Sequence, residues 1–295
     1  MKLILSRKGF DSASGGVANP ILPDGRLCPL PIPDVRAQRR YCDMQLANGS
    51  LPARYSHLGA LVAELTGGKT GADACGHLDP DLTAHSVARA DGWRPAFGQT
   101  GAALGHLHNQ AIGPGDLFLF YGWFRRVELV DDRLQYVAIA PDMHVIYGWL
   151  QVESVFYPAR CADADIPAWL RDHPHCAPDF ARQNAIYVAR ERLALAGVDG
   201  RIAGGGLFPA CRPARQLTAA ESARRSLWRL PGWFYPPAPE QALSYHGKME
   251  RWQRQGEHAL LRTVGRGQEF VLDCAHYPRC AAWLAELFAD AKVTT

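Results

Sequence analysis

The tripeptide Tyr-Gly-Trp occurs twice in this chain of 295 residues, at positions 121–123 and 147–149. Each copy lies in a run of large side chains, residues 117–124 and 145–150, that is apolar at odd and even positions alike. This pattern is typical of a strand that is covered on both faces. The two runs therefore predict neighbouring strands of one buried sheet.

The central glycines of the two copies, Gly122 and Gly148, stand in mid-strand. Such a glycine marks a bulge, or a place where another backbone or a ligand comes close. Flanking Tyr and Trp rings would suit a pocket for a flat group. Large aromatic side chains on a strand covered on both faces nevertheless belong to the core by default. We therefore expect the rings in the core, and only the glycines point to a ligand.

Shorter patterns predict the remaining elements. Residues 57–65 have helical spacing and stop at two glycines. Asp131 and Asp132 separate two alternating segments, as in a hairpin. The other predicted elements are strands at residues 185–189 and 270–272, a helix that starts at the capping box of residues 218–221, and a helix after Pro278.

Composition excludes several classes of protein. With 47% hydrophobic and 21% charged residues, the chain is typical of a soluble globular protein. Its apolar runs are shorter than the ~18 to 20 residues that span a bilayer. The apolar stretch at the N-terminus is too short for a signal peptide, so we expect a cytoplasmic protein without membrane contact.

Charge and cysteine spacing add further limits. The formal charge of +3 is too small to imply nucleic-acid binding by itself. The eight cysteines are scattered without a Cys-x-x-Cys pair, so a zinc ribbon or redox motif is not indicated. We also find no Gly-x-Ser-x-Gly motif and no dinucleotide or Walker A signature.

The first candidate site follows the first predicted strand. Arg7 and Lys8 precede a Gly-rich loop at residues 9–16 that contains Asp11 and Ser12. Backbone N–H groups and two cations in this arrangement suit a phosphate. A tight turn in which Asp11 caps backbone groups is the alternative.

A second candidate lies near the C-terminus, where a glycine loop at residues 265–267 precedes Gln268 and Glu269. One of these two side chains is expected to point inward, because side chains alternate along a strand. An inward Gln reads the edge of a base, and an inward Glu serves as a general base. Pairing with Arg266, or capping of the loop, is the alternative.

A third candidate is the sequence His77-Leu-Asp79-Pro-Asp81, which places three metal-capable side chains at alternate positions. In extended backbone they would form half of a metal site. An ordinary Asp-Pro-Asp turn is the alternative. The pair at residues 173–175, like other histidine pairs, is more often satisfied by backbone or water. Candidates for a further ligand are His106, His108 and His144.

The segment at residues 225–237 begins with Arg225 and mixes cations with aromatic side chains. Single-stranded nucleic acid binders use this mixture for phosphate contacts and stacking. A packed surface loop is the alternative interpretation.

Six blocks together resemble the nucleotide modification associated domain 3 family. They are residues 6–16, 77–82, 115–124, 144–150, 225–228 and 267–271. The likeness covers nearly the whole chain, and it implies an association with phage and bacterial systems that modify bases in DNA. It supplies no catalytic residues that transfer to this sequence. Residues 113–121, with a strand that ends at residues 148–152, are also similar to PUA-like barrels of the ASCH and EVE type. Those barrels bind RNA or modified bases in an aromatic pocket.

We therefore expect an α+β fold with a largely antiparallel central sheet or a partly open PUA-like barrel, long loops and peripheral helices. It would form a single compact domain over residues 1–295, with a possible division into a loop-rich part (1–112) and a sheet core with the C-terminal helix (113–295). The expected function is recognition or modification of a base or nucleotide. Cofactor and oligomeric state stay open.

The residues divide into roles in the enzymatic version of this function. Asp11 and Glu269 would act as acid and base. The substrate-binding residues would be Arg7, Lys8, Ser12, Tyr121, Trp123, Arg225 and Gln268. One alternative is a non-catalytic reader of modified bases, and another is a metal-dependent enzyme that uses His77, Asp79 and Asp81.

Overall fold

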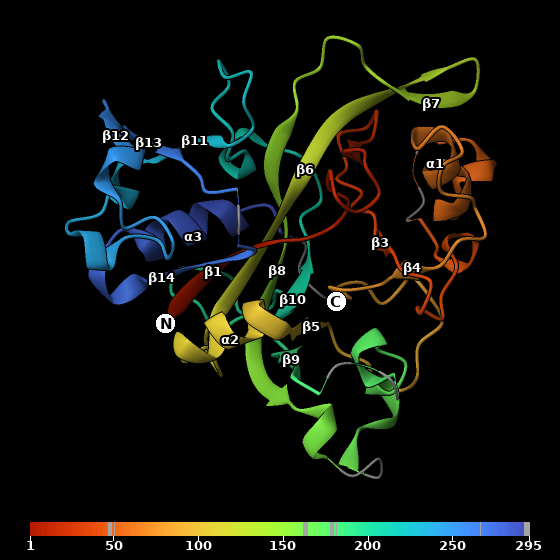
Figure 1. Ribbon diagram of the computed structural model, residues 1–295, viewed down its shortest axis with the longest axis horizontal. Helices are drawn as coiled ribbons and strands as arrows, with labels where there is room; N and C mark the ends of the chain where they lie inside the picture. Colours follow the sequence, from red (N-terminus) through yellow and green to blue (C-terminus); the bar gives the residue numbers. More distant parts are fainter. Residues whose placement is uncertain are drawn as a thin grey trace.

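The computed structural model describes residues 1–46, 49, 51–161, 165–177, 180, 182–265 and 267–291. Within these residues, nine strands form an open, mixed central sheet that crosses the middle of the molecule (Figure 1). Its main path runs in the order β14-β1-β6-β8-β9-β5, while β10 pairs with β8 and both β2 and β7 pair with β6. The fold is α+β, as the sequence predicts, and the sheet does not close into a barrel.

The bounds of the elements are as follows. The central sheet contains β1 (Lys2–Arg7), β2 (Asn19–Ile21), β5 (Ala96–Thr100), β6 (Leu117–Val130), β7 (Arg133–Tyr136), β8 (Met143–Phe156), β9 (Asn184–Ala189), β10 (Gly205–Leu207) and β14 (Glu269–Asp273). Smaller antiparallel sheets contain β3 (Ile32–Pro33) with β4 (Gly76–His77), and β11 (Leu227–Pro231) with β13 (His258–Arg262) and β12 (Trp252–Gln255). The α-helices are α1 (Leu58–Leu65), α2 (Gly101–Asn109) and α3 (Cys280–Phe288).

The paired Tyr-Gly-Trp strands are β6 and β8, and they are antiparallel neighbours as predicted. Phe120 lies opposite Gly148 and Tyr121 opposite Ile146, so the register slips by one residue between them. Tyr147 is therefore the extra residue of a β-bulge on β8. The remaining pairings of the central sheet are antiparallel, except that β1 and β2 run parallel to β6.

Three of the four aromatic rings of the pair belong to the core, whereas Trp123 is half-buried, and the glycines admit protein rather than a ligand. Tyr121, Tyr147 and Trp149 are all buried. A Cβ atom on Gly122 would lie 2.8 Å from the Lys8 carbonyl oxygen, and one on Gly148 would lie 2.9 Å from the Gly206 carbonyl oxygen. Neighbouring backbone thus occupies the space beside both glycines, where a ligand was one expectation.

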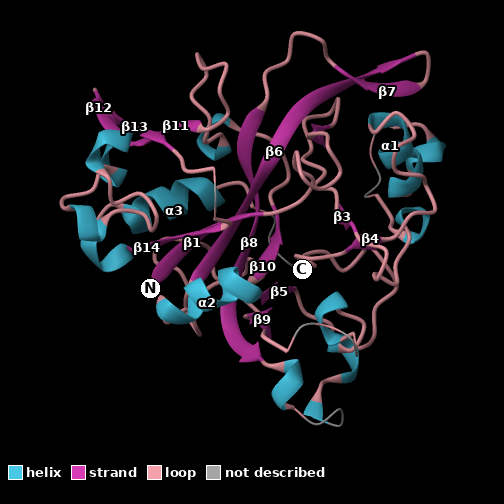
Figure 2. Cartoon of the chain, in the orientation of Figure 1, coloured by secondary structure: helices cyan, strands magenta, loops and turns pink. Residues whose placement is uncertain are grey.

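The two faces of the central sheet bury separate hydrophobic cores. One face packs against α3 and the β11-β13-β12 sheet through Leu119, Trp149 and Trp228, among others. The opposite core includes Phe97, Phe120 and Tyr147. In Figure 2, α3 and the small sheet lie on one side of the central strands, and α1 with β3 and β4 lies on the other.

Most of the elements predicted from local patterns are present. The hairpin at Asp131 and Asp132 joins β6 to β7, and both residues have the left-handed backbone (φ 48° and 59°) that a tight hairpin turn needs. α1, α3, β9 and β14 lie where the spacing predicts them.

The prediction of a helix that starts at the capping box of residues 218–221 is wrong. The Thr218 hydroxyl accepts the His144 backbone N–H and donates to the Arg225 carbonyl, while its backbone forms a bridge with Trp228. Thr218 therefore forms tertiary contacts and does not cap a helix.

A helix that crosses a membrane must be both long and apolar. Among the described residues, no helix combines the two to the degree that a bilayer-spanning helix requires.

Candidate metal centre

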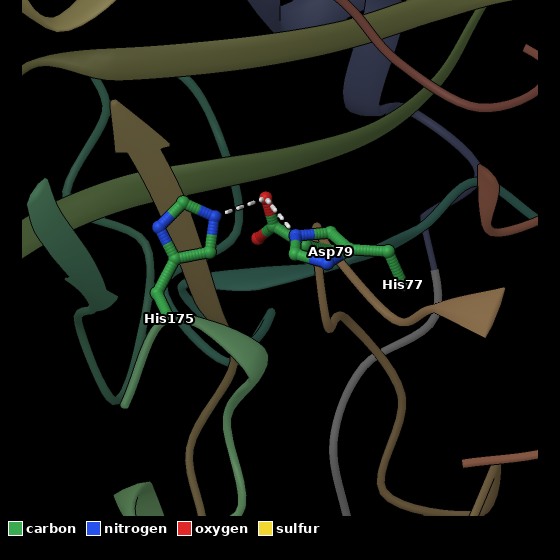
Figure 3. A group of neighbouring side chains, drawn as sticks. All are labelled: His77, Asp79 and His175. Atoms are coloured by element: carbon green, nitrogen blue, oxygen red, sulfur yellow. Dashed lines mark ion pairs between the residues drawn. The ribbon is translucent and has the colours of Figure 1, made fainter. Parts of the chain in front are cut away.

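Three side chains converge at the β5–β9 edge of the central sheet: His77, Asp79 and His175. His77 ends β4, Asp79 follows two residues later, and His175 belongs to a short 3₁₀ turn, Pro174–Cys176. The Asp79 Oδ2 atom lies 3.5 Å from His175 Nε2 and 4.0 Å from His77 Nε2. Figure 3 shows the two rings on either side of the carboxylate.

These distances suit a shared ion. The three ligand atoms all lie within 4.8 Å of one another. Two atoms that each lie ~2.1 Å from one ion are roughly 3 to 3.5 Å apart. Small side-chain adjustments would therefore bring all three into coordination. Two imidazoles and one carboxylate form a ligand set that zinc and non-haem iron use with further positions left open.

The orientation of His175 is fixed by Asn184 on β9. Asn184 Nδ2 donates to the His175 carbonyl at 2.6 Å, which leaves Asn184 Oδ1 facing His175 Nδ1, also at 2.6 Å. Because an amide oxygen only accepts, Nδ1 carries the proton of this hydrogen bond. The Nε2 atom of the neutral ring therefore presents its lone pair to Asp79.

His77 is held in the same sense. Its Nδ1 atom lies 3.3 Å from Oδ2 of Asp34, a carboxylate that only accepts. A carboxylate at this distance favours the proton on Nδ1, which leaves Nε2 available as a ligand. A carboxylate behind a metal-bound histidine is a recurrent arrangement that fixes the ring and raises its basicity.

The second carboxylate oxygen of Asp79 is already occupied. Oδ1 accepts the backbone N–H of Gly98 at 2.7 Å and lies 3.4 Å from His173 Nε2. His173 Nδ1 accepts the His175 backbone N–H at 3.2 Å, so the proton of the neutral His173 ring lies on Nε2. His173 thus turns its Nε2 N–H group toward the carboxylate, without a hydrogen-bond partner among the described residues, and Oδ2 stays available.

Three acceptor atoms therefore face one another in a buried site. Lone pairs this close repel unless a proton or a cation lies between them. Burial opposes the proton on His77, because it lowers the pKa of that imidazole below its usual value. Burial alone would raise the pKa of the Asp79 carboxyl, but the nearby His173 side chain outweighs this effect and that pKa is lowered. Both directions favour the deprotonated, ligand forms.

Asp81, the third member of the His-x-Asp-x-Asp sequence, has a different environment. Its carboxylate forms a two-point pair with Arg89, at 2.6 and 2.5 Å, and the Trp93 indole N–H lies 3.4 Å away. Burial raises its pKa, while Arg89 opposes the rise. The geometry thus groups His77 and Asp79 with His175, and it directs Asp81 to a buried ion pair. The other histidines considered as ligands contact Ser244 (His106), Tyr157 (His108) and Trp228 (His144).

A cavity of about 440 Å³ adjoins the cluster. His77 and His173 line it together with basic side chains from several loops. Another cavity, of about 370 Å³ and more apolar, is lined by Asp79 and Tyr147. The cluster therefore borders two spaces that a small molecule can enter.

The structure brings Lys8 of the first candidate site together with Gln268 and Glu269 of the second, on the sheet face that holds Phe97. Lys8 Nζ lies 2.9 Å from Glu269 Oε1 and 3.4 Å from Gln268 Oε1. Gln99 Nε2 donates to the same Glu269 oxygen at 2.5 Å. Glu269 is 1% exposed, and within the described residues its Oε2 atom has no hydrogen-bond partner.

Other candidate residues lie apart from this group. Oδ1 of Asp11 accepts the backbone N–H groups of Ala13 and Ser14, so its carboxylate caps its own turn, in which Ser12 is exposed. Arg7 follows Leu5 in the alternation of β1, on the opposite face of the sheet from Lys8.

Tyr121, Trp123 and Arg225 pack against side chains other than Glu269. Tyr121 packs edge-on against Trp228 at 5.0 Å within the core. The Arg225 guanidinium stacks on the Trp123 ring at 4.0 Å. Arg266, the middle residue of the glycine loop, lies outside the described residues.

The fold and the site define an α+β protein with a two-histidine, one-carboxylate cluster at a sheet edge. The family model of nucleotide modification associated domain 3 matches residues 2–273 of the 295, so the chain belongs to this family. No curated protein and no solved structure matches the chain.

Proposed function

We propose that this protein is a metal-dependent enzyme that acts on a nucleotide. Membership of a family named for its association with nucleotide modification supports the substrate. The convergence of His77 Nε2, Asp79 Oδ2 and His175 Nε2 supports the metal, because each atom is left as an acceptor by a partner behind it. This single arrangement carries the proposal.

A divalent ion with open positions polarises a bound oxygen atom or activates a bound water or dioxygen molecule. The protein's own residues hold and orient its ligands. Asn184 and Asp34 fix the two imidazoles, and the Gly98 N–H group fixes the carboxylate. Such partners behind the ligands affect metal affinity by roughly 10- to 100-fold when they are removed.

Metal binding is the first test. The purified chain is stripped with a chelator and dialysed against Zn²⁺, Mn²⁺ or, without oxygen, Fe²⁺, and the bound metal is measured. We expect about one ion per chain, lost in His175→Ala and Asp79→Ala and retained in His108→Ala. An equal metal content in all four proteins would refute the metal centre.

Turnover is the second test. Nucleotides and DNA are incubated with the metal-loaded chain and analysed by mass spectrometry. A mass change that requires the metal and His175 supports an enzyme. Binding without any mass change would favour the non-catalytic reader instead. The acid–base roles of Asp11 and Glu269 stay a prediction, tested by Asp11→Asn and Glu269→Gln in the same assay.

A further inference from the structure

The cavity beside His77 is lined by several arginine side chains. Among the described residues that line it, four arginines accompany three aspartates, giving a net charge of +1 with neutral histidines. The arginines are Arg36, Arg39, Arg89 and Arg171, and the aspartates are Asp34, Asp81 and Asp172. A divalent ion at the cluster would make this space more positive still.

Two of the arginines can turn toward a ligand at little cost. Arg36 pairs with Asp34 at 3.3 Å while 74% of its side chain is exposed. Arg39 pairs with Asp172 at 3.0 Å, and both side chains are more than a third exposed. The Arg39 pair is exposed on both sides and contributes ~0 to 1 kcal/mol, so an anion can replace its carboxylate partner. In the Arg36 pair only 15% of the Asp34 side chain is exposed, but the guanidinium itself lies largely in solvent and can contact an anion there. Arg89 differs, because its pair with Asp81 is buried.

We propose that this cavity binds the phosphate of a free nucleotide, with Arg36 and Arg39 as its ligands and the base or sugar directed to the metal centre. This inference rests on the proposed function and names its substrate class. Guanidinium groups match phosphate oxygens in geometry and charge. The volume of about 440 Å³ lies within the range of roughly 300 to 1,000 Å³ that small-molecule sites occupy.

The same observations disfavour a base within DNA. Enzymes that act on a flipped base hold it in a snug pocket that reads the base by hydrogen bonds and by stacking between aromatic or apolar side chains. Here the arginines line the cavity itself, beside His77. A DNA track would also need a row of cations along one face. The basic cluster at Arg212 and Arg215 is instead paired with Asp290.

The test compares ligands and variants by calorimetry on the full chain, with and without bound Zn²⁺. The ligands are the four deoxynucleoside 5′-monophosphates, the corresponding nucleosides, a 20-base single strand and its duplex. The variant is Arg36→Ala/Arg39→Ala. The matched control is Arg40→Ala, since Arg40 is adjacent and 52% exposed, pairs with Asp43, and does not line the cavity.

We expect a monophosphate to bind at least tenfold more tightly than its nucleoside, and the double variant to lose this difference. Arg40→Ala should bind like the wild type, and the metal content should be the same in all three proteins. Equal affinity for nucleoside and monophosphate would overturn the phosphate site. Binding of DNA in preference to every monophosphate would overturn the free-nucleotide substrate while leaving the metal centre intact. A chain that binds monophosphates through Arg36 and Arg39 but takes up no metal would instead overturn the proposed function alone.

Discussion

Asn184 determines which nitrogen of His175 faces Asp79. Its amide contacts both the carbonyl and the Nδ1 atom of His175 at 2.6 Å, and the two contacts can be satisfied together in one orientation of the amide. The pairing of β9 with β5 places Asn184 opposite Thr100, next to the strand that carries Gly98. Asn184, at the edge of the sheet, therefore holds His175 in the orientation that a metal ligand requires.

Replacing Asn184 tests this arrangement. In Asn184→Leu the ring of His175 loses its acceptor, so we expect metal affinity to fall by roughly 10- to 100-fold. Asn184→Asp keeps an acceptor for Nδ1 and should retain more of the affinity. Metal titrations by calorimetry measure both, with circular dichroism as the check on folding. Unchanged metal affinity in a folded Asn184→Leu protein would show that Asn184 does not set the tautomer of His175.

Gly98 gives a second test because it leaves room for the imidazole. A Cβ atom at this position would overlap the ring of His175. The backbone of Gly98 is ordinary strand, so the overlap, not conformational strain, is the effect of Gly98→Ala. We expect metal affinity to fall and stability to drop by about 1 to 3 kcal/mol, as in overpacked cores. Gly105→Ala is the control, since a Cβ atom there meets nothing within 4 Å.

Asp79 and Asp81 differ by two positions and should behave differently. Asp79→Asn replaces a candidate ligand, so we expect it to abolish metal binding. Asp81→Asn removes the carboxylate partner of Arg89, whose side chain is 14% exposed, so we expect it to lower the free energy of unfolding by up to about 3 kcal/mol. The metal content of the folded Asp81→Asn protein should stay close to that of the wild type. The reverse pattern would restore Asp81 as the ligand and exclude Asp79.

The sequence predicts the sheet better than the site, for a physical reason. A strand covered on both faces is apolar at every position, so β6 and β8 are recognisable from their own residues. Likewise, two consecutive aspartates between segments of alternating apolar and polar residues predict the β6–β7 turn. These signals are local, and the tertiary structure agrees with them.

The candidate metal centre has no such local signal. His77 and Asp79 are visible as half of a site, but His175 is far away in the sequence, and only the packing of the 3₁₀ turn against β5 brings it close. Asp81 looks equivalent to Asp79 by its spacing in the sequence, but its carboxylate forms an ion pair with Arg89. One signal was present: two short doublets, residues 77–79 and 173–175, both carry ligand-type side chains at alternate positions. The hydrogen bonds that assign the tautomers require the structure.

Buried histidines away from the cluster predict loss of stability in mild acid. Burial, with the charges of Arg225 and Arg7 nearby, lowers the pKa of His144 to about 3. Burial also lowers the pKa of His246, to about 4. Both side chains stay neutral in the folded protein at pH 5, while the unfolded chain binds protons below pH ~6.5. Stability therefore falls as the pH drops from ~6.5 toward these lowered values.

Urea denaturation at pH 7 and pH 5 measures this effect. His144 alone should account for about 2 kcal/mol of the decrease. His144→Gln keeps an acceptor for the Trp228 indole N–H, which His144 Nδ1 accepts at 2.9 Å, but it cannot titrate. The variant should lose about that much of the pH dependence, and His258→Gln, on an exposed position of β13, is the control for the histidine-to-glutamine change. An identical pH dependence in wild type and His144→Gln would contradict the assignment.

The pair of Lys8 and Glu269 gives the last prediction, because it separates a structural role from a catalytic one. The pair is largely buried, with 11% and 1% of the two side chains exposed. Removing one charge leaves the other buried and unpaired, so Lys8→Met should destabilise the fold by about 3 to 5 kcal/mol. Glu269→Gln should cost less, since its amide still bonds to Gln99. In the double variant Lys8→Met/Glu269→Gln no charge is stranded, and we expect part of the lost stability to return.

The stability of the two single variants and the double variant is compared with the turnover of each protein. If Glu269 serves only the fold, the double variant keeps its metal and its activity in proportion to the folded fraction. If Glu269 is a general base, Glu269→Gln loses activity at full folding and full metal content, and Lys8→Met/Glu269→Gln does not recover it. The geometry favours the first outcome, because the cavity beside His77 is lined by neither Lys8 nor Glu269 among the described residues. A lysine variant that unfolds no more readily than wild type would contradict the structural role and return Glu269 to the list of catalytic candidates.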